Sequence, residues 1–325
     1  MKIYDIPFPQ TEPEFWEMFP NEEACVQYLV ALRWPNGPMC SQDGSRVWWR
    51  ADKRAFQCEG GHLEYLTAGT VMHRSRTPLQ PWFLAAWKMA TYHYGISALQ
   101  FAKHVSIGYE ASFNILHKLR SGMFDPDQSP LSGRVEVDET FIGGIRKGKR
   151  GRGALGKALV IGAMELRKHK SPKKGQSDYY VSRVRYRKIK DASAENIEGF
   201  IFDVIDSGST ILTDGFASYQ NLDAWDYHHI DMNVRAKSKK DIVPHFHQEV
   251  GNLKAWIIGT HHGVSGQHLQ TYLNESAYRS NWTYSPFEAW VNMLRLAVSR
   301  GGPTYEDISS VKRGGEYAHI EGFDF

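Results

Sequence analysis

The chain has 325 residues, of which 42% are hydrophobic, so it can bury a large core and is expected to form two or three domains. It has no run of about 18 apolar residues, and its first residues lack the basic and then apolar pattern of a signal peptide. These features argue against a membrane or secreted protein, and three cysteines, an odd number, fit a reducing cytoplasmic compartment.

The charge is unevenly distributed, although the net charge is only +3. Residues 146–190 contain 16 Lys and Arg against 2 Asp and Glu, with clusters at 147–152, 168–174 and 183–188. Such a stretch is suited to neutralising the phosphates of a nucleic acid, whereas a single cluster could equally be a solvated loop. We therefore expect a nucleic acid as partner, and its candidate contacts in the first cluster are Lys147, Lys149, Arg150 and Arg152.

Residues 11–33 have apolar side chains at helical spacing and predict one amphipathic helix, which the segment 33–38 (RWPNGP) ends. The next part of the chain, residues 39–66, predicts two short strands around Trp48 and Phe56, with Cys40 before them and Cys58 at their end. This is the layout of a zinc ribbon.

The predicted ribbon has an incomplete set of zinc ligands. Structural zinc takes four ligands, usually Cys and His, but only Cys40 and Cys58 are thiols here. Asp43 and His62 could complete a Cys-Asp-Cys-His set, although carboxylates are unusual in structural sites and His62 follows Cys58 by four residues. The sequence favours a ribbon that has lost its zinc over one that binds it.

Residues 78–123 predict three helices, over 82–90, 97–105 and 109–120, joined by short turns. This spacing is that of a helix-turn-helix, in which the third helix contacts DNA. A plain helical bundle that links two domains would show the same apolar stripe. In the helix-turn-helix interpretation, the residues that face DNA are Tyr109, Ser112, Lys118 and Arg120.

A loop-rich linker at 125–133 separates this segment from a second half with a different pattern. Apolar strand-like runs begin at 134, 158, 179 and 209, and a helix is predicted near 194–204, between the third and fourth runs. Three strands, a helix and a fourth strand is the order of a ribonuclease-H-like α/β fold, a mixed sheet flanked by helices. We therefore expect an N-terminal helix and ribbon-like module (1–77), a helix-turn-helix-like segment (78–124), a ribonuclease-H-like domain (134–300) and a C-terminal tail (301–325).

Two aspartates follow short apolar runs in this second half and come before glycine turns. Asp138 lies in the run that starts at 134, and Asp214 ends the run that starts at 209. In a ribonuclease-H-like fold the first and fourth strands are neighbours, so the two carboxylates could share a divalent ion. Oxygen ligands suit Mg²⁺ or Mn²⁺, and two such ions would support in-line phosphoryl transfer. One Asp-Gly alone is usually a turn, but two in this layout favour a metal site.

These stretches resemble bacterial insertion-sequence transposases of the DDE class, which have an ISXO-like catalytic domain preceded here by a degenerate zinc ribbon. The resemblance covers nearly the whole chain and is carried by residues 66–71 (LTAGTV), 135–144 (VEVDETFIGG), 212–219 (LTDGFASY) and 252–265 (NLKAWIIGTHHGVS). It implies metal-dependent cleavage and joining of double-stranded DNA at the terminal repeats of an element, with Asp138 and Asp214 as metal ligands. It also implies homo-oligomers that assemble on DNA to hold two element ends, associated with the bacterial nucleoid.

The resemblance implies a third site residue, which in this family is Glu, Asn or His and is followed seven residues later by a lysine. Counting back from Lys254 gives His247, and two helical turns would put both on one face of a helix. Glu249 is the alternative, because it would restore a third carboxylate, but it points roughly 160° away from His247 around the same helix.

The chain departs from the family pattern at 278–283, which reads YRSNWT where relatives commonly have the more basic FRFNRR. With the missing ribbon cysteines, this keeps open a decayed copy that binds DNA without catalysis. A ribonuclease-H-like nuclease or resolvase, with metals but no strand joining, is the other alternative. The two aspartates argue against a decayed, non-catalytic copy, and the matching stretches argue against a nuclease or resolvase. We therefore expect an active transposase.

Overall fold

The chain forms two units, each with its own buried apolar residues. The structure is a computed structural model that describes residues 8–53, 55–124, 128–143, 157–234, 238, 242–304 and 307–308. Unit 1 contains the described residues up to 124 and from 284 onward, and unit 2 contains those from 128 to 283. Among the described helices, none is long and apolar enough to cross a membrane.

Unit 1 begins with two helices instead of the single helix predicted over 11–33. These are α1 (Glu12–Met18) and α2 (Glu22–Arg33). Pro20 has no backbone N–H with which to continue α1, and the side chain of Asn21 accepts a hydrogen bond from Ala24 N at 3.0 Å. Asn21 therefore caps α2 and starts a new helix. The ribbon follows as an antiparallel sheet of β1 (Val47–Arg50), β2 (Ala55–Cys58) and β3 (Leu63–Tyr65).

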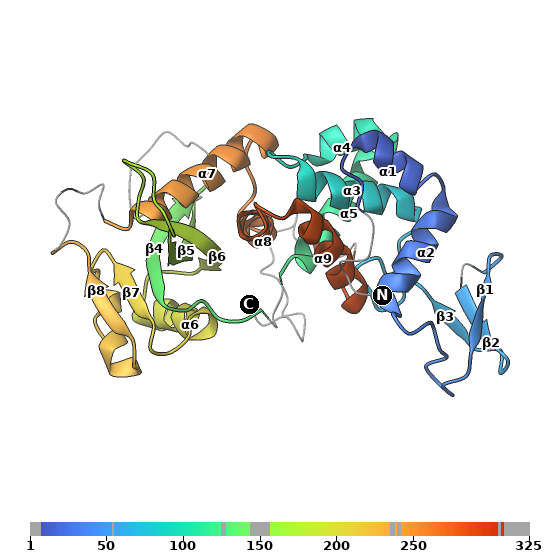
Figure 1. The fold of residues 1–325 in the computed structure, drawn as a ribbon, viewed down its shortest axis with the longest axis horizontal. Coiled ribbons are helices and arrows are strands. Elements are labelled where there is room, and N and C mark those ends of the chain that lie inside the picture. The colour runs from blue at the N-terminus through green and yellow to red at the C-terminus, as the bar shows by residue number, and fades with distance from the viewer. Residues whose placement is uncertain are drawn as a thin grey trace. The chain divides into compact units, whose positions relative to one another are not determined.

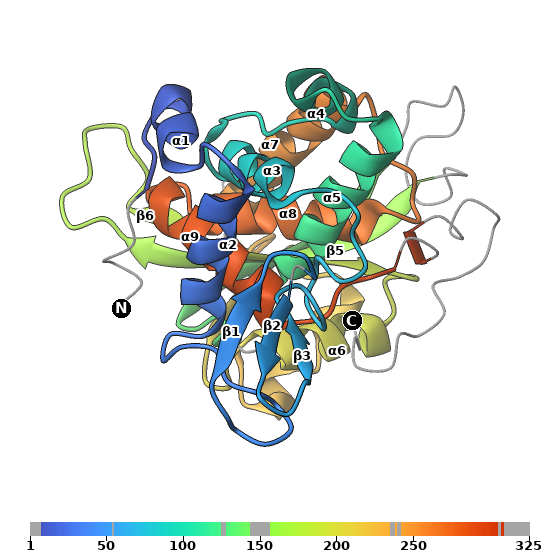
Figure 2. The same cartoon turned by 90° about the vertical axis from the view of Figure 1, so that its right-hand side faces the viewer.

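The three helices of the helix-turn-helix-like segment lie where the sequence predicts them, as α3 (Leu79–Thr91), α4 (Ala98–Val105) and α5 (Tyr109–Gly122). A further helix, α9 (Pro286–Ser299), packs against α2, α3 and α5 (Figure 2). Its buried Trp290 has its ring centroid 5.3 Å from that of Tyr28 in α2. The expected domain over 134–300 therefore needs a correction, because the apolar face of α9 is buried in unit 1.

Unit 2 is built on a five-stranded mixed sheet in the order β6-β5-β4-β7-β8 (Figure 1). Its strands are β4 (Arg134–Ile142), β5 (Ala158–Lys168), β6 (Tyr179–Ile189), β7 (Thr210–Thr213) and β8 (His228–Asp231). The first three pair antiparallel, whereas β7 is parallel to both β4 and β8. With helices against the sheet and a ribbon-like module in unit 1, the predicted α/β fold class is confirmed.

Strand β4 separates two apolar clusters because its side chains alternate between the faces of the sheet. Val135 and Val137 belong to the cluster that includes residues of α6 (Ala194–Val204). The opposite face is covered by α7 (Pro244–His261) and α8 (Leu269–Asn281). The alternation directs Glu136, Asp138 and Thr140 to this α7 face.

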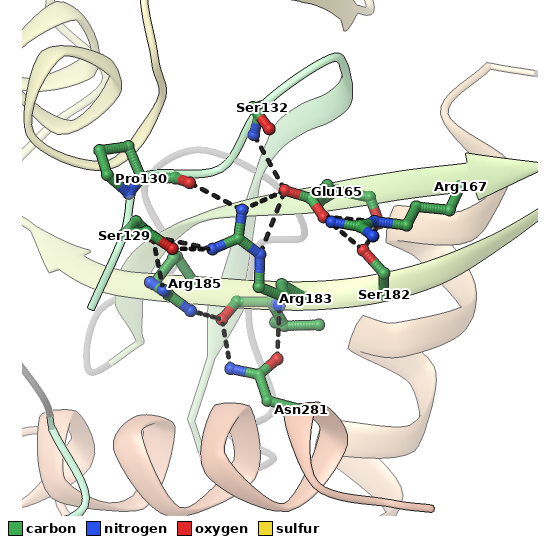
Figure 3. A network of polar contacts seen from close by, with 10 residues as sticks. Ser129, Pro130, Ser132, Glu165, Arg167, Ser182, Arg183, Arg185 and Asn281 are labelled. Carbon is green, nitrogen blue, oxygen red and sulfur yellow. Dashed lines mark hydrogen bonds and ion pairs between the residues drawn. The ribbon is translucent and has the colours of Figure 1, made fainter.

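The buried carboxylate of Glu165 on β5 joins the segment before β4 to β6 (Figure 3). It accepts hydrogen bonds from Ser132 N at 2.9 Å, Ser182 Oγ at 2.6 Å and Arg183 Nε at 3.1 Å. Arg183 also donates to the Pro130 carbonyl at 2.7 Å. Burial alone would raise the pKa of Glu165, but the hydrogen bonds from Arg183, Ser182 and Ser132 outweigh it and lower the pKa to about 2.

We predict that Glu165→Gln lowers the free energy of unfolding at pH 7 by roughly 3 kcal/mol, the equivalent of the pKa difference between about 2 and 4.5. Because the folded-state pKa is lowered, this stabilisation is present above pH 4.5 and is lost as the pH falls towards 2. The difference between variant and wild type should therefore shrink over that window in urea unfolding.

Glu195→Gln is a matched control for this change, because Glu195 is exposed on α6 of the same unit. It should alter the free energy of unfolding by less than about 0.5 kcal/mol at either pH. If Glu165→Gln behaves like this control at pH 7, the network does not stabilise unit 2.

Candidate active site

Asp138 and Asp214 come together through the pairing of β4 with β7. The strands run parallel, with Arg134 opposite Thr210 and Glu136 opposite Leu212. Continuing this register by two residues places Asp138 opposite Asp214, just beyond the last residue of β7. Leu212 contributes to the apolar cluster on the α7 face, so the same parity directs both carboxylates to that face.

The carboxylate of Asp138 lies in a poorly solvated place, since the residue is 8% exposed. Its Oδ1 accepts a hydrogen bond from Glu139 N at 2.7 Å. Burial, and after it the negative charge of Asp214, raise the pKa of Asp138 to about 7. A buried carboxylate beside a second carboxylate is stabilised in its charged form by a cation. The pair therefore fits a hard divalent ion such as Mg²⁺ or Mn²⁺.

The turn after β7, which follows Asp214 directly, depends on Gly215. Gly215 has φ +74°, and a Cβ at this position would collide with the carboxylate of Asp231. Its backbone N donates to Thr213 Oγ1 at 3.0 Å, and the same hydroxyl lies 2.8 Å from His229 Nε2. Glycine is thus required here by both backbone conformation and space.

Asp231 is a carboxylate near the site that the sequence patterns do not reveal. It is the last residue of β8 and pairs with Thr213 of β7. Its Oδ1 accepts from Asn233 N at 2.8 Å, and the Asn233 side chain donates to the Asp214 carbonyl. Asp214 is recognisable in the sequence because a glycine follows it, but no glycine follows Asp231. Asp231 could be found only from the parallel pairing of β8 with β7.

Helix α7 is attached to β4 on both sides of Asp138. Near its start, the buried Glu136 accepts a hydrogen bond from Phe246 N at 2.8 Å. Two turns later, Lys254 Nζ donates to Thr140 Oγ1 at 2.7 Å. Burial, and after it the charge of Lys157, lower the pKa of Lys254. Because Glu136 and Thr140 flank Asp138 on one face of the strand, α7 runs alongside the carboxylate.

The two alternatives for the third site residue lie on opposite flanks of α7. At 100° per residue, His247 lies within about 20° of Lys254, on the flank that reaches Thr140 of β4. His247 is exposed there. Glu249 points to the other flank, where Ser280 Oγ of α8 donates to its carboxylate at 2.8 Å. The geometry therefore favours His247.

The cations expected on the third helix of the helix-turn-helix-like segment need a correction. Lys118 is 8% exposed and donates to the His73 carbonyl at 3.1 Å, and Arg120 is 1% exposed. Ser112 is fully buried, so only Tyr109 of the four expected residues is exposed. The reason is that α5 packs against α3, α4 and α9, which leaves little of its surface for DNA.

The first basic cluster cannot be placed. Lys147, Lys149, Arg150 and Arg152 lie outside the described residues.

The four candidate zinc ligands of the ribbon come together, although the sequence favours a ribbon without zinc. The Sγ atoms of Cys40 and Cys58 each lie 3.5 Å from His62 Nδ1, and Asp43 Oδ2 lies 3.9 Å from Cys58 Sγ. All four ligand atoms lie within 4.8 Å of one another. Tetrahedral zinc with ligands at about 2.0–2.3 Å separates neighbouring ligand atoms by about 3.5 Å. The cluster therefore has the size of a zinc site.

Asp43 is ionised within this cluster. Hydrogen bonds from the side chain and backbone of Ser45 are the main reason that its pKa falls to about 2. A charged carboxylate oxygen is available as the fourth donor, so the donor set fits zinc in charge as well as in size.

Known protein families match the chain both in the ribbon region and in the region that carries the two aspartates. Residues 130–281 match the ISXO2-like transposase domain, and residues 20–60 match a transposase zinc-ribbon domain. A protein of Halobacterium salinarum, named as an uncharacterized protein in transposable element ISH50, is 24% identical over 291 residues. That alignment covers 86% of this chain and 98% of the relative.

Both matched regions are domains of transposases, and the longer one, residues 130–281, is of the DDE class. The match to an ISXO2-like transposase domain preceded by a transposase zinc-ribbon domain confirms the resemblance predicted from the sequence.

Proposed function

We propose that this protein is an insertion-sequence transposase that cleaves DNA at the ends of its element and joins them to target DNA. The proposal is supported by the parallel register of β4 and β7, whose continuation brings Asp138 opposite Asp214, within an ISXO2-like domain. The substrate is double-stranded DNA, both the terminal repeats of the element and the target. Two ends must be held during the reaction, so we also propose a homo-oligomer on DNA.

In this proposal Asp138 and Asp214 hold Mg²⁺ or Mn²⁺. Bound ions of this kind activate a water or a 3′-hydroxyl and stabilise the leaving oxygen in an in-line phosphoryl transfer. Burial and the charge of Asp214 raise the pKa of Asp138 to about 7, so binding of the ion would favour its ionised form and lower this pKa.

We assign the third position to His247 and a DNA contact to Lys254. His247 shares a flank of α7 with Lys254, which is held over β4 by its hydrogen bond to Thr140. This hydrogen bond holds the ammonium group of Lys254 next to Thr140, which is two residues after Asp138 on the same face of β4. From there the ammonium group is suitably placed to contact a phosphate of the bound DNA strand.

We predict that Asp138→Asn, Asp214→Asn and His247→Ala each reduce cleavage and strand transfer by at least about a hundredfold. The assay uses linear DNA that carries the element ends, with Mg²⁺ or Mn²⁺, and DNA binding should survive in all three variants. Glu249→Gln is the matched control, because it changes α7 on the opposite flank and should keep activity within about threefold.

Each of the other outcomes has a definite meaning. A loss in Glu249→Gln with full activity in His247→Ala would move the third ligand to the other flank. DNA binding without cleavage by the wild type in either metal would favour a decayed, non-catalytic protein. Cleavage without any strand transfer would favour a nuclease or resolvase.

We also propose that the ribbon holds one zinc ion through Cys40, Asp43, Cys58 and His62. The protein purified without chelator is expected to contain about one zinc per chain by elemental analysis, and Cys58→Ser should lose most of it. Cys25→Ala is the control, because Cys25 is a buried thiol outside the cluster. Equal zinc content in the two variants would show that the cluster does not bind the metal.

A further inference from the structure

The hairpin between β5 and β6 carries a basic cluster that the proposed active site does not use. Residues 167–178 contain five Lys and Arg and a single acidic residue, Asp178. Lys168, Lys170, Lys173 and Lys174 are all exposed. Four ammonium groups on one short loop create a local positive field that attracts a polyanion.

The tip of this hairpin is held in shape by its own hydrogen bonds. Gln176 N donates to the Lys173 carbonyl at 2.9 Å, and the Gln176 side chain accepts from Lys173 N at 3.0 Å. Gln176 Nε2 also lies 3.1 Å from His169 Nε2, and His169 N donates to the Asp178 carbonyl at 2.9 Å. Gly175, at φ +81°, allows the tight turn. The lysines therefore project from an ordered backbone, which lowers the entropy lost on binding.

The base of the hairpin is joined to the first turn of α7 by a side-chain hydrogen bond, and Figure 1 shows the hairpin and the helix side by side. His245 Nε2 lies 3.0 Å from Ser177 Oγ and 3.2 Å from the Tyr179 carbonyl. Its Nδ1 lies 2.8 Å from Glu136 Oε1, on the strand that carries Asp138. A continuous series of contacts thus joins the hairpin to the active-site strand. A loop that only adds solubility needs no such attachment.

The sheet register sets how far the hairpin lies from the active site. Arg134 is opposite Leu166, near the end of β5, and Asp138 lies four residues further along β4. At 3.3 Å per residue, Leu166 lies about 13 Å along the strand from the position opposite Asp138, and the hairpin begins just beyond Leu166. Successive phosphates of one DNA strand advance by about 3.4 Å along the helix axis. A phosphate at the hairpin would therefore be about four or more base pairs from one at Asp138.

We propose that the β5–β6 hairpin is a DNA-backbone contact of unit 2, which binds the duplex several base pairs from the phosphate at the active site. The inference rests on the proposed function, because it takes the same DNA as ligand. Lysine ammonium groups neutralise phosphates without reading bases, so the contact adds affinity and position but not sequence preference.

The test compares two triple variants of the full-length protein, in which Lys170, Lys173 and Lys174 are all changed to Gln or all to Arg. Affinity for linear duplex DNA is measured by fluorescence anisotropy in buffer without added Mg²⁺ or Mn²⁺ at several salt concentrations. The Gln variant should bind at least about tenfold more weakly at low salt. Its slope of log affinity against log salt should be shallower by about two, since each phosphate contact contributes about 0.9. The Arg variant should stay within about threefold of wild type.

Two results would overturn the proposal. Wild-type affinity and salt slope in the Gln variant would show that the lysines do not contact DNA. An equal loss in the Arg variant would show that the shape of the loop matters and its charge does not. Because no Mg²⁺ or Mn²⁺ is added, the measurement is separate from catalysis. A wild type that binds DNA but cannot cleave it would refute the proposed function and leave the hairpin result in force.

Discussion

The unit that carries the proposed active site depends on one constraint, the parallel register of β4 and β7. This register is what places Asp138 opposite Asp214, and a slip of one residue would turn one carboxylate to the α6 face. Two features fix it. Side chains of β4 alternate between two separate apolar clusters, and the Glu165 network holds the segment before β4 at Ser132. The Glu165 network therefore helps to hold two like charges next to each other.

Placing two carboxylates together is unfavourable until a cation binds. The raised pKa of Asp138 reflects this, since burial and the charge of Asp214 both oppose its ionisation. Helix α7 does not relieve the repulsion between the two carboxylates, because its hydrogen bonds go to Glu136 and Thr140, on either side of Asp138. A helix attached at two points along a strand offers one flank to the proposed metal site. That flank carries His247 and Lys254.

Local pattern was sufficient to predict four of the five strands of the sheet in unit 2 and the three helices α3, α4 and α5, because each of these elements depends on periodicity and turn residues along one stretch of chain. The patterns were insufficient where partners come from distant segments. Lys118 and Arg120 occupy positions typical of an exposed helix, yet α9 and the other helices of unit 1 cover them. Asp231 became visible only when β8 was aligned with β7. Two thiols suggested a ribbon without zinc, but Asp43 and His62 reach the same point in space.

The most direct test of the account is a crystal structure of the protein soaked with Mn²⁺ and analysed by anomalous scattering. We expect an anomalous peak in contact with the carboxylates of both Asp138 and Asp214, with His247 on the near flank of α7 and Glu249 still hydrogen-bonded to Ser280. Carboxylates that point to different faces of the sheet, or Mn²⁺ bound by only one of them, would contradict the proposed two-aspartate site.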